Sequence, residues 1–231
     1  MKIRTYIVLG VLAGVASVAA ALTPEEAVKR MDWNYQNSLR IKLADKIVYI
    51  DPTWVDGSEK ADIVLLTHTH GDHFKADVVQ KLTGPQTTVL AAFDREGYVR
   101  IKPGDKRTFD GLTIEAVPAY NIKKTSNHPQ ANQWCGFILS GEGVRIYDAG
   151  DTERIPEMKS ITCDIALLPL GQTYTMTSVD EAVQAALDVK AKIAIPVHFG
   201  LYEGTNADAD TFIATLAAKG VKTRKLPTPP K

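Results

Sequence analysis

A run of four apolar residues, Ile63–Leu66, leads directly into a segment that holds three of the chain's five histidines. A short, continuous apolar run is typical of a strand buried on both faces. The segment behind it is THTHGDH, residues 67–73. Because open α/β folds bind ligands at the carboxyl ends of their strands, we expect these side chains to line a functional site.

The spacing within this segment suits metal binding. In an extended backbone, side chains two residues apart project to the same side, so His68 and His70 can hold one ion together. Gly71 permits a sharp turn, after which Asp72 and His73 emerge in another direction and can hold a second ion. Imidazole and carboxylate groups suit zinc, manganese or iron at neutral pH. We therefore interpret the segment as a metal site and not as a polar loop formed by chance.

Around this segment the pattern alternates between strands and helices. Thr23, Pro24 and Glu26 predict a capped helix that ends near Trp33. A hairpin is predicted for Leu39–Leu43 and Lys46–Ile50. Apolar residues at helical spacing predict a helix over residues 73–82, and later helices are expected over 178–187 and 208–219. Further strands are predicted over residues 88–92, 112–117, 136–140, 144–147, 165–170 and 193–197. Residues 226–231 are expected to form an extended, poorly ordered tail. The pattern indicates one layered α/β domain over residues 22–231.

The first 21 residues resemble a secretory signal peptide. Lys2 and Arg4 precede a run of apolar and small residues that ends in three alanines. The apolar core of this run is shorter than the roughly 20 residues that span a bilayer comfortably. Residues 5–24 carry no charge, so an uncleaved membrane anchor is the alternative. We expect a periplasmic or secreted protein that begins near Leu22 and touches a membrane only if this segment is kept.

Composition narrows the class of partner. The formal net charge is zero, with 27 basic and 27 acidic residues, so there is no basic excess to indicate nucleic acid binding. A hydrophobic content of 45% is enough for a sizeable core without disulfides. Cys135 and Cys163 are interpreted as two small buried side chains, with a disulfide as the alternative. A small-molecule substrate is expected, whereas the oligomeric state is not predicted.

The pattern HxHxDH after a hydrophobic strand resembles the signature of the metallo-β-lactamase superfamily. That family's fold is a four-layer αβ/βα sandwich of two mixed β-sheets with helices outside. The likeness continues at Asp51-Pro52, at Asp151 within a Gly-Asp-Thr segment and at His198 within Pro-x-His-Phe-Gly. The segment from Pro118 to Pro129, which contains His128, is similar to a loop of one branch. That branch includes ascorbate-6-phosphate lactonase and N-acyl-phosphatidylethanolamine phospholipase D.

The resemblance implies two divalent transition-metal ions, with zinc expected first and manganese or iron as alternatives. Three residues would hold the first ion: His68, His70 and His128. The second would be held by Asp72, His73 and His198, with Asp151 bridging both. All five histidines of the chain have a place in this set, and none is left over.

The implied activity is that of a binuclear metal-dependent hydrolase. A metal-bridged hydroxide would cleave an ester, lactone or phosphodiester bond, and Asp72 would also orient this nucleophile. A periplasmic class B-like β-lactamase is an alternative, although Asp151 stands where those enzymes tend to carry Cys or Ser. A non-catalytic metal-binding protein is the other alternative, and the complete ligand set disfavours it.

The chain differs from that branch at two short segments, and both differences bear on the identity of the substrate. Tyr35-Gln36-Asn37 stands where the branch often has Gly-His-[AS], and Gly171-Gln172-Thr173 stands where Gly-Gly-Thr is common. Tyr120 and Tyr174 are candidates for donors to a substrate oxygen. Asp51 is expected either to hydrogen-bond the histidine segment or to form a simple turn. Asp148 is expected to be structural.

Overall fold

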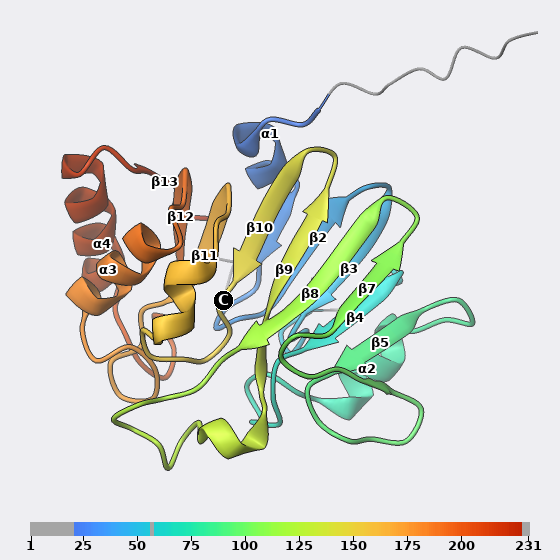
Figure 1. The fold of residues 1–231 in the computed structure, drawn as a ribbon. Coiled ribbons are helices and arrows are strands. Elements are labelled where there is room, and N and C mark those ends of the chain that lie inside the picture. The colour runs from blue at the N-terminus through green and yellow to red at the C-terminus, as the bar shows by residue number, and fades with distance from the viewer. Residues whose placement is uncertain (1–20, 56–57, 228–231) are drawn as a thin grey trace, which may run out of the picture.

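The computed structural model describes residues 21–55 and 58–227, which fold into two mixed β-sheets (Figure 1). The first sheet has six strands in chain order: β1 (Met31–Trp33), β2 (Leu39–Leu43), β3 (Lys46–Ile50), β4 (Ile63–Leu66), β5 (Thr88–Ala91) and β6 (Val99–Arg100). The second has seven, in reverse chain order: β13 (Lys222–Thr223), β12 (Ile193–Val197), β11 (Ile165–Pro169), β10 (Val144–Asp148), β9 (Cys135–Gly141), β8 (Leu112–Pro118) and β7 (Lys106–Phe109).

Helices cover the outer faces of both sheets. The helices are α1 (Pro24–Val28), α2 (Ala76–Leu82), α3 (Val179–Asp188) and α4 (Asn206–Ala218), with 3-10 turns η1 (Gln130–Asn132) and η2 (Pro156–Ser160). Buried side chains of α2 pack on the first sheet, while α3 and α4 contact β11, β12 and β13 of the second (Figure 1). The layers therefore run helix, sheet, sheet, helix, and the predicted αβ/βα sandwich is confirmed.

The alternation of side chains along β4 shows how the sequence builds these layers. All four of its residues are buried, as predicted from the continuous apolar run. Ile63 and Leu65 belong to the core between the sheets, whereas Val64 and Leu66 belong to the cluster under α2. Because successive side chains of a strand point to opposite faces, one apolar run supplies both cores.

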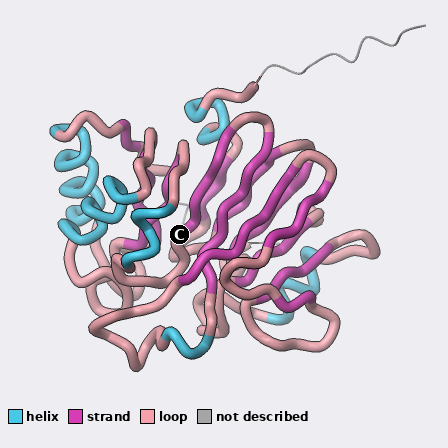
Figure 2. Tube along the Cα trace, in the orientation of Figure 1, coloured by secondary structure: helices cyan, strands magenta, loops and turns pink. Residues whose placement is uncertain are grey.

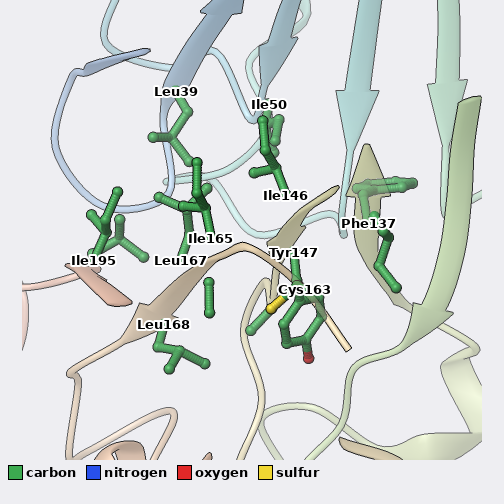
Figure 3. Close-up of a cluster of buried hydrophobic side chains, with 14 of the residues drawn as sticks. Leu39, Ile50, Phe137, Ile146, Tyr147, Cys163, Ile165, Leu167, Leu168 and Ile195 are labelled. Atoms are coloured by element: carbon green, nitrogen blue, oxygen red, sulfur yellow. The ribbon is translucent and has the colours of Figure 1, made fainter. Parts of the chain in front are cut away.

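Side chains from both sheets meet in the larger core. Leu39 and Ile50 come from the first sheet, and Ile146 and Ile165 from the second (Figure 3). All four are fully buried. Burial of such side chains contributes about 1.5–3 kcal/mol each relative to leaving them exposed, so this interface is a major source of stability.

The first helix is shorter than predicted. The capping box of Thr23 and Glu26 is confirmed, but α1 ends at Val28 and residues 31–33 form β1. Met31 and Trp33 are buried on one side of this strand and Asp32 is exposed on the other. Antiparallel pairing with β2 makes these residues a strand at a place where a helix was expected, and the alternating burial follows from that pairing.

Other elements follow the predicted order. The hairpin of β2 and β3 has the predicted bounds, and Ser178 caps α3 by accepting a hydrogen bond from the N–H group of Glu181. The helix predicted over residues 73–82 begins at Ala76, because residues 73–75 still belong to the histidine-rich loop. β6, β7 and β13 were not predicted.

The two cysteines are buried and free, so the prediction of two small buried side chains is confirmed. Leu226 is buried in the core, which corrects the prediction of a loose tail at that residue; residues 228–231 lie outside the described part. The proposed signal peptide also lies almost entirely outside it. Within the described residues, no helix is both long enough and apolar enough to cross a membrane.

Candidate metal centre

The predicted site residues follow strands that end at one edge of the two sheets. Residues 67–73 follow β4, Asp151 lies just after β10, and His198 comes directly after β12. His128 lies in the long connection between β8 and β9, which runs below the sheets in Figures 1 and 2. Because β10 and β12 are both parallel to β11, their carboxyl ends meet at the same edge.

The first group contains His68, His70 and His128. Each offers a ring nitrogen within 4.8 Å of those of the other two. Nε2 of His68 lies 3.0 Å from Nδ1 of His70. His68 and His128 are buried, whereas His70 is partly exposed and lines a cavity.

The second group contains Asp72, His73 and His198, whose ligand atoms also lie within 4.8 Å of one another. Nε2 of His73 is 3.2 Å from Nε2 of His198. Oδ2 of Asp72 is 3.7 Å from each of these two nitrogens. The structure thus brings the predicted residues together in these two groups, which adjoin each other where the ring centroids of His68 and His73 are 4.0 Å apart.

Asp151 lies between the groups. Its Oδ2 is 3.3 Å from Nε2 of His128 in the first group and 3.2 Å from Nε2 of His198 in the second. Its Oδ1 is 3.3 Å from Nε2 of His73. A single carboxylate thus faces both groups, which is the placement that a bridging ligand needs.

Each buried imidazole has its outer nitrogen held by a neighbouring oxygen. Nδ1 of His73 donates to Oδ2 of Asp51 at 2.7 Å, and Nδ1 of His198 lies 2.9 Å from Oε1 of Glu203. The hydroxyl of Thr67 donates to Asp51 and is left to accept from Nδ1 of His68 at 2.9 Å. Such partners orient the rings, so that Nε2, the nitrogen on the side of Asp151, is the one left to bind a cation.

Asp51 can be distinguished from the ligands by its hydrogen bonds. Oδ1 accepts from the N–H group of Thr67 at 2.8 Å, and Oδ2 accepts from His73 and from the Asn37 amide. Both oxygens are therefore engaged by protein donors, although Asp51 also lies within ligand distance of His68 and His73. The predicted hydrogen bonds from Asp51 to the histidine segment are confirmed.

The donor set fits divalent cations held between the two groups. Ring nitrogens face one another at 3.0 and 3.2 Å, a separation at which two lone pairs repel unless a proton or a cation lies near both. Nε2 of His128 and Oδ1 of Asp151 are buried without a hydrogen-bond partner among the described residues. Buried polar atoms are rarely left without a partner. Cations held by imidazole and carboxylate groups would satisfy both atoms.

The charges of the site keep the bridging carboxylate ionised. Burial alone would raise the pKa of Asp151, but His198 and His73 outweigh it and hold this pKa well below its usual range. Burial opposes protonation of His198, yet Asp151 and Glu203 raise its pKa to about 9. Burial, followed by the charge of His73, lowers the pKa of His68 well below its ordinary value. A cation bound here would replace the proton that His198 otherwise carries, because metal ligands must be deprotonated.

His128 is fixed although it lies outside any strand. The N–H group of Asn121 donates to the carbonyl of His128 at 2.8 Å, and Nδ1 of His128 lies 3.2 Å from the carbonyl oxygen of Tyr174. Lys124 donates to the carbonyls of Gln172 and Met176 at 2.9 and 3.1 Å. The carboxylate of Glu153 accepts from three consecutive N–H groups, those of residues 122–124. These contacts tie the β8–β9 connection to the loop after β11 and position the ring.

Three polar residues of the site were not predicted to contact it. Nε2 of Gln36 lies 3.2 Å from Oδ2 of Asp72 and 3.1 Å from Nε2 of His198. The Asn37 amide donates to the buried carboxylates of Asp51 and Asp148. Glu203 is buried beside His198. The only feature of the sequence that singled out any of them is that residues 35–37 differ from the family pattern. We related that difference to the substrate and not to the metal ligands.

A cavity of about 530 Å³ opens over the two groups. Tyr174 lines it, and its role as a donor to a substrate oxygen stays a prediction. Tyr120 does not line it, because its hydroxyl donates to the Glu157 carboxylate at 3.0 Å. The prediction for Tyr120 was therefore wrong. Asp148 is fully buried behind the site, in agreement with a structural role.

Comparisons with known proteins agree with this geometry. Residues 30–198 match the family model described as "Beta-lactamase superfamily domain". A UPF0173 metal-dependent hydrolase of Thermoplasma acidophilum is 33% identical over 77% of this chain and 87% of its own length. Another from Archaeoglobus fulgidus is 33% identical over 70% of this chain and 76% of its own length.

Solved structures show the same architecture. A protein of Parabacteroides distasonis assigned to the metal-dependent hydrolases is 33% identical, with a TM-score of 0.77 over 86% of this chain and 93% of its own. A metallo hydrolase of Ignicoccus hospitalis, 20% identical, shares the fold with a TM-score of 0.70, over 87% of this chain and 95% of its own. The chain belongs to the metallo-β-lactamase superfamily, among its metal-dependent hydrolases.

Proposed function

We propose that this protein is a binuclear hydrolase that cleaves an ester, lactone or phosphodiester bond. The observation that carries this proposal is the position of Asp151 between two ligand groups, within 3.3 Å of a histidine from each. His68, His70 and His128 would hold one ion, and Asp72, His73 and His198 the other, with Asp151 shared. Zinc is the first candidate, and manganese or iron would suit the same donors.

When bound, such ions would supply a water whose pKa is lowered toward 7 and would stabilise the negative charge that develops on oxygen. The protein's own groups supply the remaining requirements. Hydrolysis joins the water oxygen to the acyl carbon or phosphorus, breaks the bond to the leaving oxygen and places one proton on that oxygen.

Asp72 is the residue placed to orient the water. It is the least buried member of the second group and lines the cavity, so its carboxylate can reach the water as well as an ion. The Gln36 amide, 3.2 Å away, donates to Oδ2 and limits the rotation of this carboxylate. A fixed acceptor near the reacting atoms reduces the entropy lost on the way to the transition state.

The comparisons give no support to the alternative of a β-lactamase. The relatives described above carry the name metal-dependent hydrolase. Retention of a carboxylate, Asp151, between the two groups supports hydrolysis of an ester, lactone or phosphodiester.

A substrate screen tests the proposal. Purified protein is reconstituted with zinc, manganese or iron and assayed with p-nitrophenyl esters, simple lactones, bis-p-nitrophenyl phosphate and the β-lactam nitrocefin. We expect turnover of at least one ester, lactone or diester that a chelator abolishes and added metal restores. Faster hydrolysis of nitrocefin than of every other compound, or no turnover with both ions bound, would contradict the proposal.

A further inference from the structure

Several large apolar side chains are exposed in the loops that carry the proposed metal centre. Five large hydrophobic residues of the described chain are at least 44% exposed: Val99, Ile122, Tyr174, Leu201 and Tyr202. All but Val99 lie in loops that carry proposed ligands or hold them in place. Ile122 is in the connection that carries His128, while Leu201 and Tyr202 follow His198.

Two of these side chains form walls of the cavity. Tyr174 and Tyr202 line it, and they are 45% and 58% exposed. Apart from proposed ligands and Gly71, Asn127 is the only other described residue in the lining. Tyr174 and Tyr202 are thus the two aromatic surfaces that a substrate meets beside the proposed ligands.

The backbone that carries Tyr174 is fixed before any substrate binds. Its N–H group donates to Oε2 of Glu203 at 2.6 Å, and its carbonyl accepts from Nδ2 of Asn121 at 2.7 Å. Tyr202 directly precedes Glu203, whose side chain is buried beside His198. An aromatic ring on a fixed backbone loses little conformational entropy on binding, so it contributes contact area at low cost.

We propose that the substrate is a carboxylic ester or lactone whose apolar or aromatic body packs against Tyr174 and Tyr202. This rests on the proposed function and narrows it, because two exposed aromatic side chains beside the proposed ligands suit an acyl or aryl group joined directly to the bond that is cleaved. In the reaction, the water oxygen bonds to the acyl carbon, the acyl C–O bond breaks, and the alcohol oxygen leaves with a proton. The acyl chain or aryl group supplies the area that the tyrosines bury.

A series of p-nitrophenyl esters of increasing chain length tests this inference. The metal-loaded wild type should hydrolyse the hexanoate with kcat/KM about tenfold or more above that of the acetate, because each buried methylene adds to binding. It should also prefer the hexanoate to bis-p-nitrophenyl phosphate. In Tyr174→Ala and Tyr202→Ala, the ratio of hexanoate to acetate should fall by about tenfold. Val99→Ala, which removes an exposed side chain away from the cavity, is the matched control and should keep the wild-type ratio.

The outcomes separate this inference from the function on which it rests. Metal content is measured in all four proteins, and both tyrosine variants should bind as much metal as the wild type. Ester hydrolysis with a flat chain-length profile, or a profile that the tyrosine variants do not alter, would overturn the inference alone. The same holds if the charged diester is the best substrate. Absence of hydrolysis of every ester, lactone and diester with both ions bound would overturn the proposed function itself.

Discussion

Oε1 of Glu203 lies 2.9 Å from Nδ1 of His198, and Oε2 of the same carboxylate accepts from the N–H groups of Thr173 and Tyr174. One buried side chain thus orients a proposed ligand and fixes the loop that carries a cavity wall. Gly171 leaves the space that the Glu203 carboxylate occupies, because a Cβ built at residue 171 would lie 1.6 Å from Oε1 of Glu203.

Replacement of Glu203 by alanine should weaken one of two metal sites. His198 would lose the partner that holds its tautomer and ring, and loss of such partners typically reduces metal affinity or activity by about 10- to 100-fold. Metal titration of Glu203→Ala against the exposed-residue control Glu96→Ala measures this effect. Equal affinities in the two variants would show that Glu203 does not support the ligand.

His128→Ala should lower activity by about a hundredfold or more and weaken one metal site selectively. The ring is held from outside by the Tyr174 carbonyl, and its free Nε2 faces Asp151 at 3.3 Å. Elemental analysis and circular dichroism check the loss of metal and the retention of the fold. Unchanged metal content and activity would show that His128 is a loop residue that binds no metal.

Gln36 provides a test that separates backbone strain from side-chain function. Its φ is +45°, in the left-handed region that glycine adopts without cost, and its amide contacts Asp72. Gln36→Gly and Gln36→Ala both remove the amide, so both should lose activity to a similar degree. Only glycine adopts this left-handed conformation without strain, so the free energy of unfolding of Gln36→Gly should exceed that of Gln36→Ala by about 1 kcal/mol.

Guanidinium unfolding of the two variants and their kcat values provide the readouts. Equal stability would mean that the left-handed backbone stores no strain at this residue. Full activity in either variant would mean that the amide does not orient Asp72.

The sequence predicted an element correctly where neighbouring residues alone determine it, and failed where a contact with a distant segment does. The hairpin of β2 and β3 was predicted correctly because alternation and its turn lie within a dozen residues. The strand at residues 31–33 was missed because its hydrogen bonds come from β2 and its three residues are too few to show a period. The helix-capping residues that precede this strand favoured a helix that continues to Trp33, which was wrong.

The candidate ligands could be predicted from the sequence because histidines are rare in this chain and lie in spaced motifs. The residues that hydrogen-bond to these ligands could not be predicted. Asn37 joins Asp51 to Asp148, which is 111 residues away in sequence, and Glu203 belongs to no motif that the sequence displays. Contacts of this kind arise only when distant loops meet. The signal peptide and the two-ion assignment stay predictions.

The two cysteines give a prediction that does not depend on the metal centre. Burial raises the pKa of the Cys135 thiol and that of the Cys163 thiol to about 12 each. Unfolded thiols ionise near pH 8.5, so the folded state retains these protons while the unfolded state loses them. The contribution of the thiols to stability should therefore be complete below about pH 8.5 and decline between there and pH 12.

Dithiobis(nitrobenzoate) at pH 8 should find no reactive thiol in the native protein and two in guanidinium. The midpoint of guanidinium unfolding should be lower at pH 9.5 than at pH 7.5, and Cys135→Ala should reduce that difference. Rapid modification of the native protein would show that the thiols are accessible and their pKa values ordinary.

Elemental analysis of the wild type and of Asp151→Ala shows whether this carboxylate is shared by two metal ions. Both proteins are stripped with a chelator, reloaded with zinc and dialysed before analysis. We expect close to two ions per chain in the wild type, and at most one in the variant with activity lost, because the missing carboxylate faces both groups. Full metal occupancy together with full activity in Asp151→Ala would show that Asp151 does not bridge two ions.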